Sequence, residues 1–577
     1  MPSRTGRVHV ATTSRTYKGK LYQTHLLRRS FRVGSQVRHE TLGNISHLPP
    51  DLIDLIRRSL AGEQFLPASQ AFLVERNLPH GHVQAVLGSM YRLGLDSLLA
   101  SKPCRERDLI LAMIAERLLH PCSKLATTRL WHTTTLAEEL RVADATEDDL
   151  YQAMDWLLAR QSHIEKKLAQ RHLQDGSLVL YDVSSSYYEG HTCPLARLGH
   201  NRDGKKGLPI IVYGLLTDSE GRPVAVDVYP GNTGDPTTVP DQVDKLRQRF
   251  GLSHVVLVGD RGMLTETQIG QLKQHPGLGW ISALRGPAIG ELVDGGSLQL
   301  SLFDETNLAE INSPAYPGER LVACFNPLLA DERRRKRGEL IEATEKELAK
   351  IAAQVKRRTR TPLSEAEIAL KVGRVLNRYK VAKHFELNIA DGVFAWTRRE
   401  ESIRRESQLD GVYVVRTSEP ESRCSAPDAV RRYKSLAQVE RAFRSLKGMD
   451  LRIRPIHHRT EDHVRAHILL CMLAFYVEWH MRRDLAPLLF QDEELSRDRT
   501  RRDPVAPAEC SASAQRKKLE RVTADGFPVH SFETLLRELA TRCRNTCRIP
   551  SDPSATTFQQ LTEPTALQAR ALRLLGL

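Results

Sequence analysis

Short apolar runs and amphipathic stretches alternate along the chain and predict a mixed α/β protein. Residues 8–46 alternate between apolar and polar positions, which is typical of strands, and they include a basic hairpin. Amphipathic stretches with helical spacing follow at residues 51–60, 105–120 and 148–161. Residues 1–175 are therefore predicted to form a mixed N-terminal module.

A second series of elements begins near residue 177. The pattern predicts strand 177–182, strand 207–218, strand 222–230, helix 236–250, strand 254–260, helix 265–274 and strand 279–285. Three hairpin-like strands followed by helix, strand, helix and strand is the order of a ribonuclease H-like fold. Such a fold brings together carboxylates from its first strand, its fourth strand and a late helix.

Two aspartates stand where predicted strands of this series end. Asp182 and Asp260 each close a run of aliphatic residues. A carboxylate at such a sheet edge is costly unless it binds a metal or another cation. Either aspartate alone could instead cap the helix that follows it.

Residues 433–447 predict an amphipathic helix with an unusual polar stripe. Tyr433, Glu440 and Lys447 follow one another at intervals of seven residues and share a helix face, and Arg444 points the same way. The helix can dock through a neighbouring apolar face, which consists of Leu436, Val439, Phe443 and Leu446. The alternative is that the stripe is an ordinary solvated helix face.

Asp182, Asp260 and Glu440 together supply three carboxylates. That number is enough to hold two divalent cations, which clamp the attacking and leaving oxygens of a phosphodiester. Hard oxygen ligands favour Mg²⁺, with Mn²⁺ as a substitute. The phenol and the cations beside Glu440 suit a polyanionic substrate.

Several ordered segments resemble one protein family. They are residues 199–218, 228–238, 259–263, 409–417 and 454–467. The sequence is similar to the DDE transposases of bacterial insertion sequences, in the insertion-sequence-four superfamily and its insertion sequence 1634 group. The signature of that superfamily is Tyr, Arg, Glu and Lys; Tyr433, Glu440 and Lys447 fit its spacing, whereas Leu436 stands at the arginine position.

The resemblance implies roles for individual residues. The catalytic and metal-binding carboxylates of the family carry over onto Asp182, Asp260 and Glu440. DNA phosphates would be contacted by Tyr433, Arg441, Arg444 and Lys447, with Arg441 or Arg444 in place of the missing arginine. The enzyme would bind double-stranded DNA, both terminal inverted repeats and target, as a homodimer in a synaptic complex.

The interval between Asp260 and Glu440 spans 180 residues, too many for one connection. Residues 287–410 are therefore predicted to be an inserted α+β subdomain that interrupts the core at 176–286 and 411–485. Its charged helix near 331–358 has either a solvated or coiled-coil face or lies along DNA. Residues 486–577 are predicted to form a tail with a polar linker and helices that could mediate self-association.

The charge agrees with a nucleic-acid partner. The chain has 84 Lys and Arg against 70 Asp and Glu, a net charge of +14. Basic residues outnumber acidic ones by 11 to 3 in residues 1–60 and by 9 to 2 in residues 431–460. Anionic lipid would attract the same charge. The charge and position of residues 1–175 suggest a DNA-end-binding module, with a simple scaffold as the alternative.

Membrane and cysteine signals point away from a secreted or membrane protein. The longest apolar run, from Ala466, is too short to span a bilayer, and the first residues lack an apolar signal core. The 9 cysteines are scattered, which fits a reducing compartment. The expected location is the bacterial cytoplasm, in association with the nucleoid.

These patterns together predict a Mg²⁺-dependent DNA transposase. Two alternatives stay open: a ribonuclease H-like endonuclease that hydrolyses DNA without strand transfer, and a domesticated DNA-binding protein without activity. The three carboxylates argue against the second alternative. Strand-transfer products would separate the transposase from the nuclease.

Overall fold

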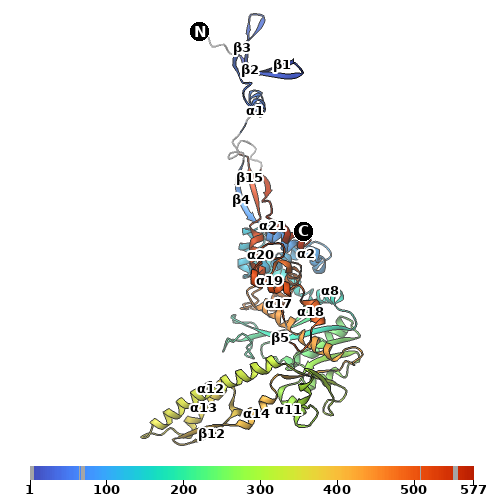
Figure 1. Ribbon diagram of the computed structural model, residues 1–577, viewed down its shortest axis with the longest axis vertical. Coiled ribbons are helices and arrows are strands. Elements are labelled where there is room, and N and C mark those ends of the chain that lie inside the picture. Colours follow the sequence, from blue (N-terminus) through green and yellow to red (C-terminus); the bar gives the residue numbers. More distant parts are fainter. Residues whose placement is uncertain (1–5, 64, 66–71, 507–508, 550–556) are drawn as a thin grey trace. The chain divides into compact units, whose positions relative to one another are not determined.

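The computed structural model describes residues 6–63, 65, 72–506, 509–549 and 557–577 (Figure 1). The chain forms two compact units: unit 1 is Met1–Asn77 with Arg544–Thr562, and unit 2 is Leu78–Cys543 with Glu563–Leu577. The predicted boundary at residue 175 does not separate these units, because helices between residues 81 and 158 pack on helices of the main domain. The finer functional division of the chain stays a prediction.

The first sheet of unit 1 confirms the strands predicted at residues 8–46. It consists of β1 (Arg7–Tyr17), β2 (Lys20–Val33) and β3 (Gln36–Asn44), all antiparallel. Lys18 and Gly19 form the two-residue turn between β1 and β2, with φ angles of 48° and 75°. Positive φ at both positions matches the twist of a tight hairpin. Helix α1 (Pro50–Leu60) follows and packs on β1.

A second, three-stranded sheet pairs segments from both ends of the chain. Its order is β16 (Thr557–Leu561), β15 (Cys543–Arg548) and β4 (Leu73–Pro79). Asn77 donates from Nδ2 to Asn545 Oδ1 at 2.7 Å, across 468 residues of sequence. The sequence predicts a linker and helices after residue 486 and misses these strands, because a partner so distant leaves no local pattern.

Unit 2 is built on a mixed sheet in the order β10-β11-β14-β9-β8-β5-β6-β7. Strand β8 is parallel to both β5 and β9, and the other neighbouring pairs are antiparallel. The strands are β5 (Ser177–Tyr187), β6 (Ile210–Asp218), β7 (Pro223–Pro230), β8 (Val255–Val258), β9 (Leu278–Ala283), β10 (Leu308–Ile311), β11 (Arg320–Phe325) and β14 (Val412–Thr417). The strand order predicted between residues 177 and 285, and the mixed α/β class, are confirmed.

The predicted helix at residues 236–250 is not one regular helix. A 3₁₀ turn at Asp235–Thr238 leads into α9 (Val239–Asp244), and a π-helical turn at Lys245–Arg249 follows. Lys245 in that turn is buried and pairs with Asp227 at 2.6 Å and Glu165 at 3.3 Å. The predicted position of the helix is therefore correct, but the helix itself is irregular.

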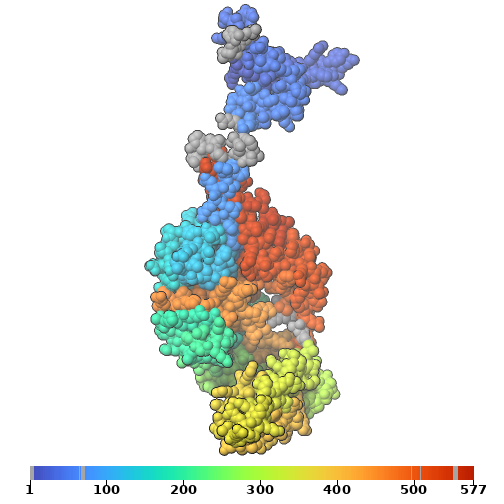
Figure 2. Space-filling view, turned by 90° about the vertical axis from the view of Figure 1, so that its left-hand side faces the viewer, coloured from blue at the N-terminus to red at the C-terminus, as the bar shows by residue number. Residues whose placement is uncertain are grey.

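A layer of helices packs around α17 (Glu461–Asp484), which is buried along most of its length. This helix contacts α2 (Gly81–Arg92), α4 (Arg105–Leu119), α7 (Glu147–Leu158) and β7. In Figure 2 the orange segment that includes α17 lies directly below the cyan segment that includes α4. The prediction of a buried helix here is confirmed, and within the described ranges no helix is long and apolar enough to cross a membrane.

The predicted insertion differs from a self-contained subdomain at one point. Its strands β10 and β11 belong to the main sheet, where β11 pairs with β14. The part with a separate apolar core consists of α12 (Pro327–Arg357), α13 (Glu365–Tyr379), β12 (Phe385–Ala390), β13 (Val393–Arg398) and α14 (Glu400–Gln408). Helix α12 packs on α13 through side chains that include Ile341 and Leu348.

Shorter helices complete the fold. They are α3 (Leu95–Leu99), α5 (Lys124–Leu130), α6 (Leu136–Glu139), α8 (Gln161–His172), α10 (Glu266–Leu272), α11 (Gly286–Asp294), α18 (Leu495–Arg501), α19 (Ala512–Glu520), α20 (Phe532–Ala540) and α21 (Ala566–Leu574). Part of the predicted C-terminal linker is thus helical. Lys517 of α19 is buried and donates to the carbonyl oxygens of Ala486 (2.9 Å) and Gln491 (2.6 Å), so this segment packs on unit 2.

Candidate active site

The register of two parallel strands brings Asp182 and Asp260 together. Strand β5 pairs with β8 from Ser177 opposite Val255 to Leu180 opposite Val258. If this register is continued by two residues beyond Leu180 and Val258, Asp182 lies opposite Asp260. Asp260 follows the end of β8, as predicted.

Asp182 does not end its strand, so that prediction is wrong. Strand β5 continues to Tyr187, because β6 still pairs with it beyond β8, with Asp182 opposite Leu215. The consequence is an open side: past Leu180, β5 has lost β8 on one edge and keeps β6 on the other. Asp182 therefore lies inside a strand but at the edge of the parallel part of the sheet.

The surroundings of Asp182 disfavour its charge. Burial first, and then the charges of Asp260 and Asp235, raise the pKa of the Asp182 carboxyl to about 7. The backbone N–H of Val183, which donates to Asp182 Oδ1 at 2.7 Å, and the nearby Arg202 act in the opposite direction. A proton or a bound cation would each neutralise this carboxylate.

Asp260 lies in a tight turn on the surface. Its carbonyl oxygen accepts from the backbone N–H groups of Met263 and Leu264, both at 3.0 Å. The N–H of Gly262 donates to Asp260 Oδ2 at 3.2 Å. Arg285 donates to the carbonyl oxygen of Arg261 at 3.3 Å from the far side of the turn. These contacts hold an exposed carboxylate at the end of β8.

The predicted continuous helix at 433–447 is wrong. The chain forms α15 (Ala426–Lys434) and α16 (Ala437–Lys447), with Ser435 and Leu436 between them. Ser435 donates from Oγ to the carbonyl oxygen of Arg432 at 2.5 Å, which helps to end α15. The polar stripe therefore spans two helices rather than one.

Tyr433 nevertheless stays beside the carboxylates. Burial raises the pKa of the Tyr433 hydroxyl, and the adjacent charges of Asp260 and Glu440 raise it further. The phenol thus lies close to a carboxylate of the sheet edge and to the carboxylate of α16. Through Tyr433, the structure brings Glu440 into the neighbourhood of Asp260.

The apolar face of α16 is confirmed. Leu436, Val439, Phe443 and Leu446 are all buried, and the helix packs on β5 and α17. The rings of Phe443 and Tyr213 meet edge to face with centroids 5.8 Å apart. Leu436 thus serves packing at the position where the family has an arginine.

The opposite face of α16 presents exposed charges. Glu440, Arg441 and Arg444 are exposed. Among the described residues, neither arginine has a side-chain hydrogen bond or an ion pair, so both guanidinium groups are available to a ligand.

Lys447 is engaged in a structural ion pair. Its ammonium lies 3.1 Å from Asp203 Oδ1, and Arg454 pairs with the same carboxylate. The backbone N–H of Tyr187 donates to Asp203 Oδ2 at 3.1 Å. Burial lowers the pKa of Lys447, whereas Asp203 raises it. This pair ties the end of α16 to the end of β5.

Sequence reasoning missed three charged residues of the site. Arg202 contacts both carboxylate oxygens of Asp235 at 2.5 Å, and both residues influence the charge of Asp182. Asp203 is the third. All three lie in segments that resemble the family, 199–218 and 228–238, so the resemblance was a signal that could have found them.

The carboxylate oxygens are of the type that binds hard cations, but the three side chains do not form a complete set of metal ligands. In the part of the chain that is described, no group of three or more His, Cys, Asp or Glu side chains is arranged to hold a metal ion. Asp260 raises the pKa of Asp182, and Asp260 and Glu440 both raise the pKa of Tyr433, which lies between them. Asp182, Asp260 and Glu440 remain candidate metal ligands.

A cleft of about 1370 Å³ opens beside Asp260. It lies between the 260–262 turn, helix α11 and the helical part of the insertion. Its charged lining is mixed and consists of Asp260, Arg261, Arg285, Glu291, Asp294, Arg333, Lys383, Glu386, Arg399, Glu400, Glu401, Arg405, Glu406 and Asp410. The insertion therefore borders the space in front of one candidate catalytic residue.

Two protein families match segments of this chain. Residues 175–477 match the family described as transposase DDE domain, which is more than half of the chain. Residues 10–70 match the N-terminal domain of IS1634 family transposases. This chain is a DDE transposase of the IS1634 family. The transposase thus carries its two family matches in the segments that contain the basic N-terminal sheet and the candidate active site.

Comparisons with individual proteins add little. No curated protein matches this transposase. One solved structure with similarity is described as a cryo-EM structure of the piggyBac transposase synaptic complex with hairpin DNA. It shares 11% identity, with 80% of this chain and 76% of that chain covered and a TM-score of 0.32.

Proposed function

We propose that this transposase binds the terminal inverted repeats of its own element, cuts a strand to leave a 3′-OH and joins that end to target DNA. Asp182, Asp260 and Glu440 would be the catalytic residues, on a ribonuclease H-like core. The observation that supports this most is the level register of Asp182 and Asp260, together with the pKa of Asp182, which burial and neighbouring carboxylates raise to about 7. Unneutralised carboxylates at a sheet edge favour a cation ligand.

The donor set suits Mg²⁺, with Mn²⁺ as a substitute, because all candidate ligands are carboxylate oxygens. Asp182 and Asp260 would hold the ions, with Glu440 completing the set. When bound, such ions would activate the attacking hydroxyl and stabilise the charge on the leaving oxygen. Asp182 would release its proton as the site fills, because ligands bind metals in their deprotonated form.

The side chains of α16 would hold the DNA strand beside the carboxylates. Arg441 and Arg444 have no partner among the described residues and lie on the same exposed face as Glu440. Their guanidinium groups can each donate two parallel hydrogen bonds to a phosphate. Tyr433 would orient the strand near Asp260. Lys447 could reach a phosphate only by leaving Asp203, so the first phosphate contacts are assigned to the two arginines.

Unit 1 would recognise the element's ends. The hairpin of β1 and β2 exposes Tyr17 and Tyr22 at 55% each, next to Lys18 and Lys20. Aromatic and cationic side chains on an exposed ribbon suit contacts with the DNA backbone and its grooves. A homodimer would hold two ends in one synaptic complex.

The test of catalysis uses purified full-length protein, a labelled DNA end of the element, a target plasmid and Mg²⁺. Wild-type protein is expected to produce both a nicked end and plasmid joined to the label. Asp182→Asn, Asp260→Asn and Glu440→Gln should each lose cleavage but keep end binding, because phosphate contacts lie elsewhere. Glu332→Gln, an exposed carboxylate on α12, is the matched control. Normal cleavage by one of the three variants would remove that residue from the site.

The same assay separates the alternatives. Cleaved DNA without any joined product would identify an endonuclease that does not transfer strands. End binding without either product, in Mg²⁺ and in Mn²⁺, would identify a DNA-binding protein without activity.

A second test addresses unit 1. Lys18→Ala combined with Lys20→Ala should weaken binding of end DNA and reduce its dependence on salt, because fewer counterions are released. The measurement is a gel shift of end DNA against unrelated DNA at several salt concentrations. Equal affinity and equal salt slope for wild type and variant would place end recognition outside this hairpin.

A further inference from the structure

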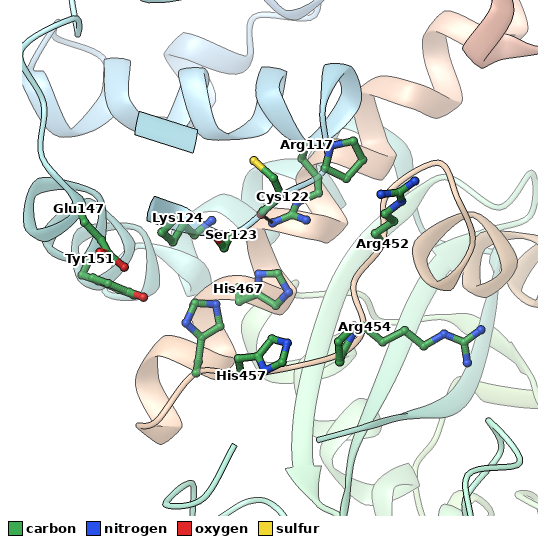
Figure 3. A pocket seen from close by; sticks show the side chains of 13 residues that line it. Arg117, Cys122, Ser123, Lys124, Glu147, Tyr151, Arg452, Arg454, His457 and His467 are labelled. Carbon is green, nitrogen blue, oxygen red and sulfur yellow. Dashed lines mark hydrogen bonds between the residues drawn. The ribbon is translucent and has the colours of Figure 1, made fainter. Parts of the chain in front are cut away.

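A small basic pocket lies between the N-terminal helices of unit 2 and the segment that links α16 to α17 (Figure 3). Its volume is about 290 Å³. Residues 117–124 line one side, α7 contributes Glu147 and Tyr151, and residues 452–458 with His467 line the other side. The roles assigned to the candidate active site do not use this pocket.

Three cations face the pocket without a carboxylate partner among the described residues: Arg117, Lys124 and Arg452. Within the described ranges, Arg117 donates only to backbone carbonyl oxygens, those of Cys122 at 3.2 Å and Leu451 at 3.5 Å. Arg454 also lines the pocket, but Figure 3 shows its guanidinium extending away from the other cations, and it pairs with Asp203. Arg117, Lys124 and Arg452 therefore carry the positive charge of the pocket.

Lys124 is the cation with the strongest need for a partner. Its side chain is 4% exposed, and in the described residues no group lies within hydrogen-bonding or ion-pairing distance of its ammonium. Burial and the adjacent charge of Arg117 lower the pKa of Lys124 to about 7. In Figure 3 its nitrogen points toward the same space as Ser123 and Arg117. A buried ammonium without a counter-ion is costly, and an anion in the pocket would remove that cost.

The other lining groups leave this positive charge in place. The carboxylate in the lining is that of Glu147, which stands beside Tyr151; burial first and then Glu147 raise the pKa of that phenol. His458 and His467 are neutral at neutral pH, because burial lowers the pKa of His458 to about 3 and that of His467 far below its ordinary value. The lining therefore carries Arg117, Arg452 and the protonated form of Lys124 against one carboxylate.

We infer that this pocket binds a phosphate group. A phosphate offers several acceptor oxygens to converging donors, and the forks of Arg117 and Arg452 suit two of its edges. Lys124 would supply the third positive charge from the buried side. The pocket volume accommodates a phosphate with part of an attached sugar. The ligand is either a phosphate of a DNA strand or free phosphate, and the inference does not depend on the catalytic roles of Asp182, Asp260 and Glu440.

The first experiment titrates the full-length protein with inorganic phosphate by calorimetry, at constant ionic strength, and follows its melting temperature. Wild type should bind and gain thermal stability, whereas Lys124→Gln should bind at least about tenfold more weakly. Without phosphate, Lys124→Gln should melt at the same temperature as wild type or higher, because a buried unpaired charge is gone. Lys336→Gln, an exposed lysine of α12, controls for the loss of charge and should behave as wild type.

The second experiment identifies the source of the phosphate. A single-stranded oligonucleotide with a 5′-phosphate is compared with the same strand ending in a hydroxyl. Tighter binding of the phosphorylated strand that disappears in Lys124→Gln assigns the pocket to a DNA strand end. Binding of inorganic phosphate alone, lost in the same variant, confirms the pocket and assigns it to free phosphate.

One result overturns the inference: neither inorganic phosphate nor the phosphorylated strand distinguishes wild type from Lys124→Gln. If that variant fails to fold, Arg452→Gln takes its place, because the Arg452 side chain is exposed and its loss leaves no buried gap. Undiminished phosphate binding by Arg452→Gln would then overturn the inference. Cleavage assays of the acidic variants are separate, so failure here leaves the proposed catalytic site untouched.

Discussion

The sheet edge holds carboxylates without ion-pair partners, whereas the helical insertion holds charged side chains in ion pairs. At the sheet edge, Asp182 and Asp260 approach each other, and neither forms an ion pair with a described residue. In the insertion, charges lie in matched pairs: Arg337 with Asp410, Arg398 with Glu345 and Lys383 with Glu406. Both regions border the same cleft.

The difference shows which charges serve the fold and which serve a ligand. Arg337 donates to both carboxylate oxygens of Asp410, at 2.8 and 2.5 Å, and both side chains are buried. The charges of such a pair neutralise each other without any other molecule. Two neighbouring carboxylates repel each other and lack a neutralising cation, which lowers the stability of the folded protein. Removal of a charge should therefore have opposite effects on stability in the two regions.

The largest effect is expected at Asp182. In EDTA, Asp182→Asn should raise the melting temperature, because a buried carboxylate beside Asp260 is removed, while cleavage in Mg²⁺ is lost entirely. The measurement pairs a thermal melt with the end-cleavage assay. A variant that melts below wild type and retains cleavage would contradict the comparison at its first point.

The opposite sign is expected in the insertion. Arg337→Met should destabilise the insertion by roughly 3–5 kcal/mol, because Asp410 is left buried without its partner. Hydrogen exchange of α12 and α14 measures the effect where it arises. Arg337→Met combined with Asp410→Leu should recover most of the loss.

A surface pair of the same helix is the control. Arg335 and Glu339 lie 3.0 Å apart with side chains 69% and 61% exposed. Arg335→Ala should change stability by less than about 0.5 kcal/mol, since water screens such pairs. A loss as large as that for Arg337→Met would show that burial is not what separates the two pairs.

A smaller, kinetic effect is expected for Arg444. A charge-assisted contact with a phosphate is worth roughly 1.5–3 kcal/mol, so Arg444→Ala should slow cleavage about tenfold to a hundredfold without changing the fold. Arg444→Lys should restore only part of the rate, because an ammonium lacks the fork of the guanidinium. Single-turnover cleavage with circular dichroism as the folding check measures this. Wild-type rates for Arg444→Ala would leave Arg441 as the replacement for the missing arginine.

Lys447 offers a direct contrast with Arg444. Its ammonium is paired with Asp203, so Lys447→Ala should lower the melting temperature as well as the rate. A variant with wild-type stability and a slow rate would instead show that Lys447 leaves Asp203 to contact DNA.

A pH-dependent effect is expected at Glu478, which combines features of both regions. Glu478 Oε1 accepts from Arg482 at 2.5 Å, whereas its Oε2 has no hydrogen-bond partner among the described atoms. Burial raises the pKa of Glu478 from its ordinary value of 4.5 to about 7. The folded state therefore holds this proton more tightly than the unfolded state does.

The sign of the pH effect follows from that shift. Stability from the protonated form is present below pH 4.5 and is lost as pH rises through 7. Relative to Glu478→Gln, wild type should lose roughly 1–3 kcal/mol between pH 5 and pH 8. Thermal melts of both proteins at the two pH values measure the difference. Parallel pH profiles would show that Arg482 compensates the charge fully.

The sequence by itself determined the elements whose signal is local. The strands from β5 to β9, the buried helix α17 and the docking face of α16 follow from periodic apolar residues. Asp260 was found because the apolar run of β8 ends there. The role of Leu436 in packing was also visible, since it falls in line with Val439 and Phe443.

Only the tertiary structure decided features that depend on a distant partner. Pairing with β6 extends β5 beyond Asp182, and β11 joins the main sheet because β14 lies beside it. Periodicity reports which side of an element is buried but carries no information about what covers it. The separation of α15 from α16 likewise left no trace in the helical pattern of residues 433–447.

Charge shows the same limit most clearly. Lys447 and Lys124 are both lysines near apolar residues in the sequence, yet Asp203 neutralises the first and no described residue neutralises the second. A side chain's charge is local, but its electrostatic energy depends on every group that folding brings near it. The sequence therefore supplied the candidate residues, and the three-dimensional arrangement decided which of them still need a ligand.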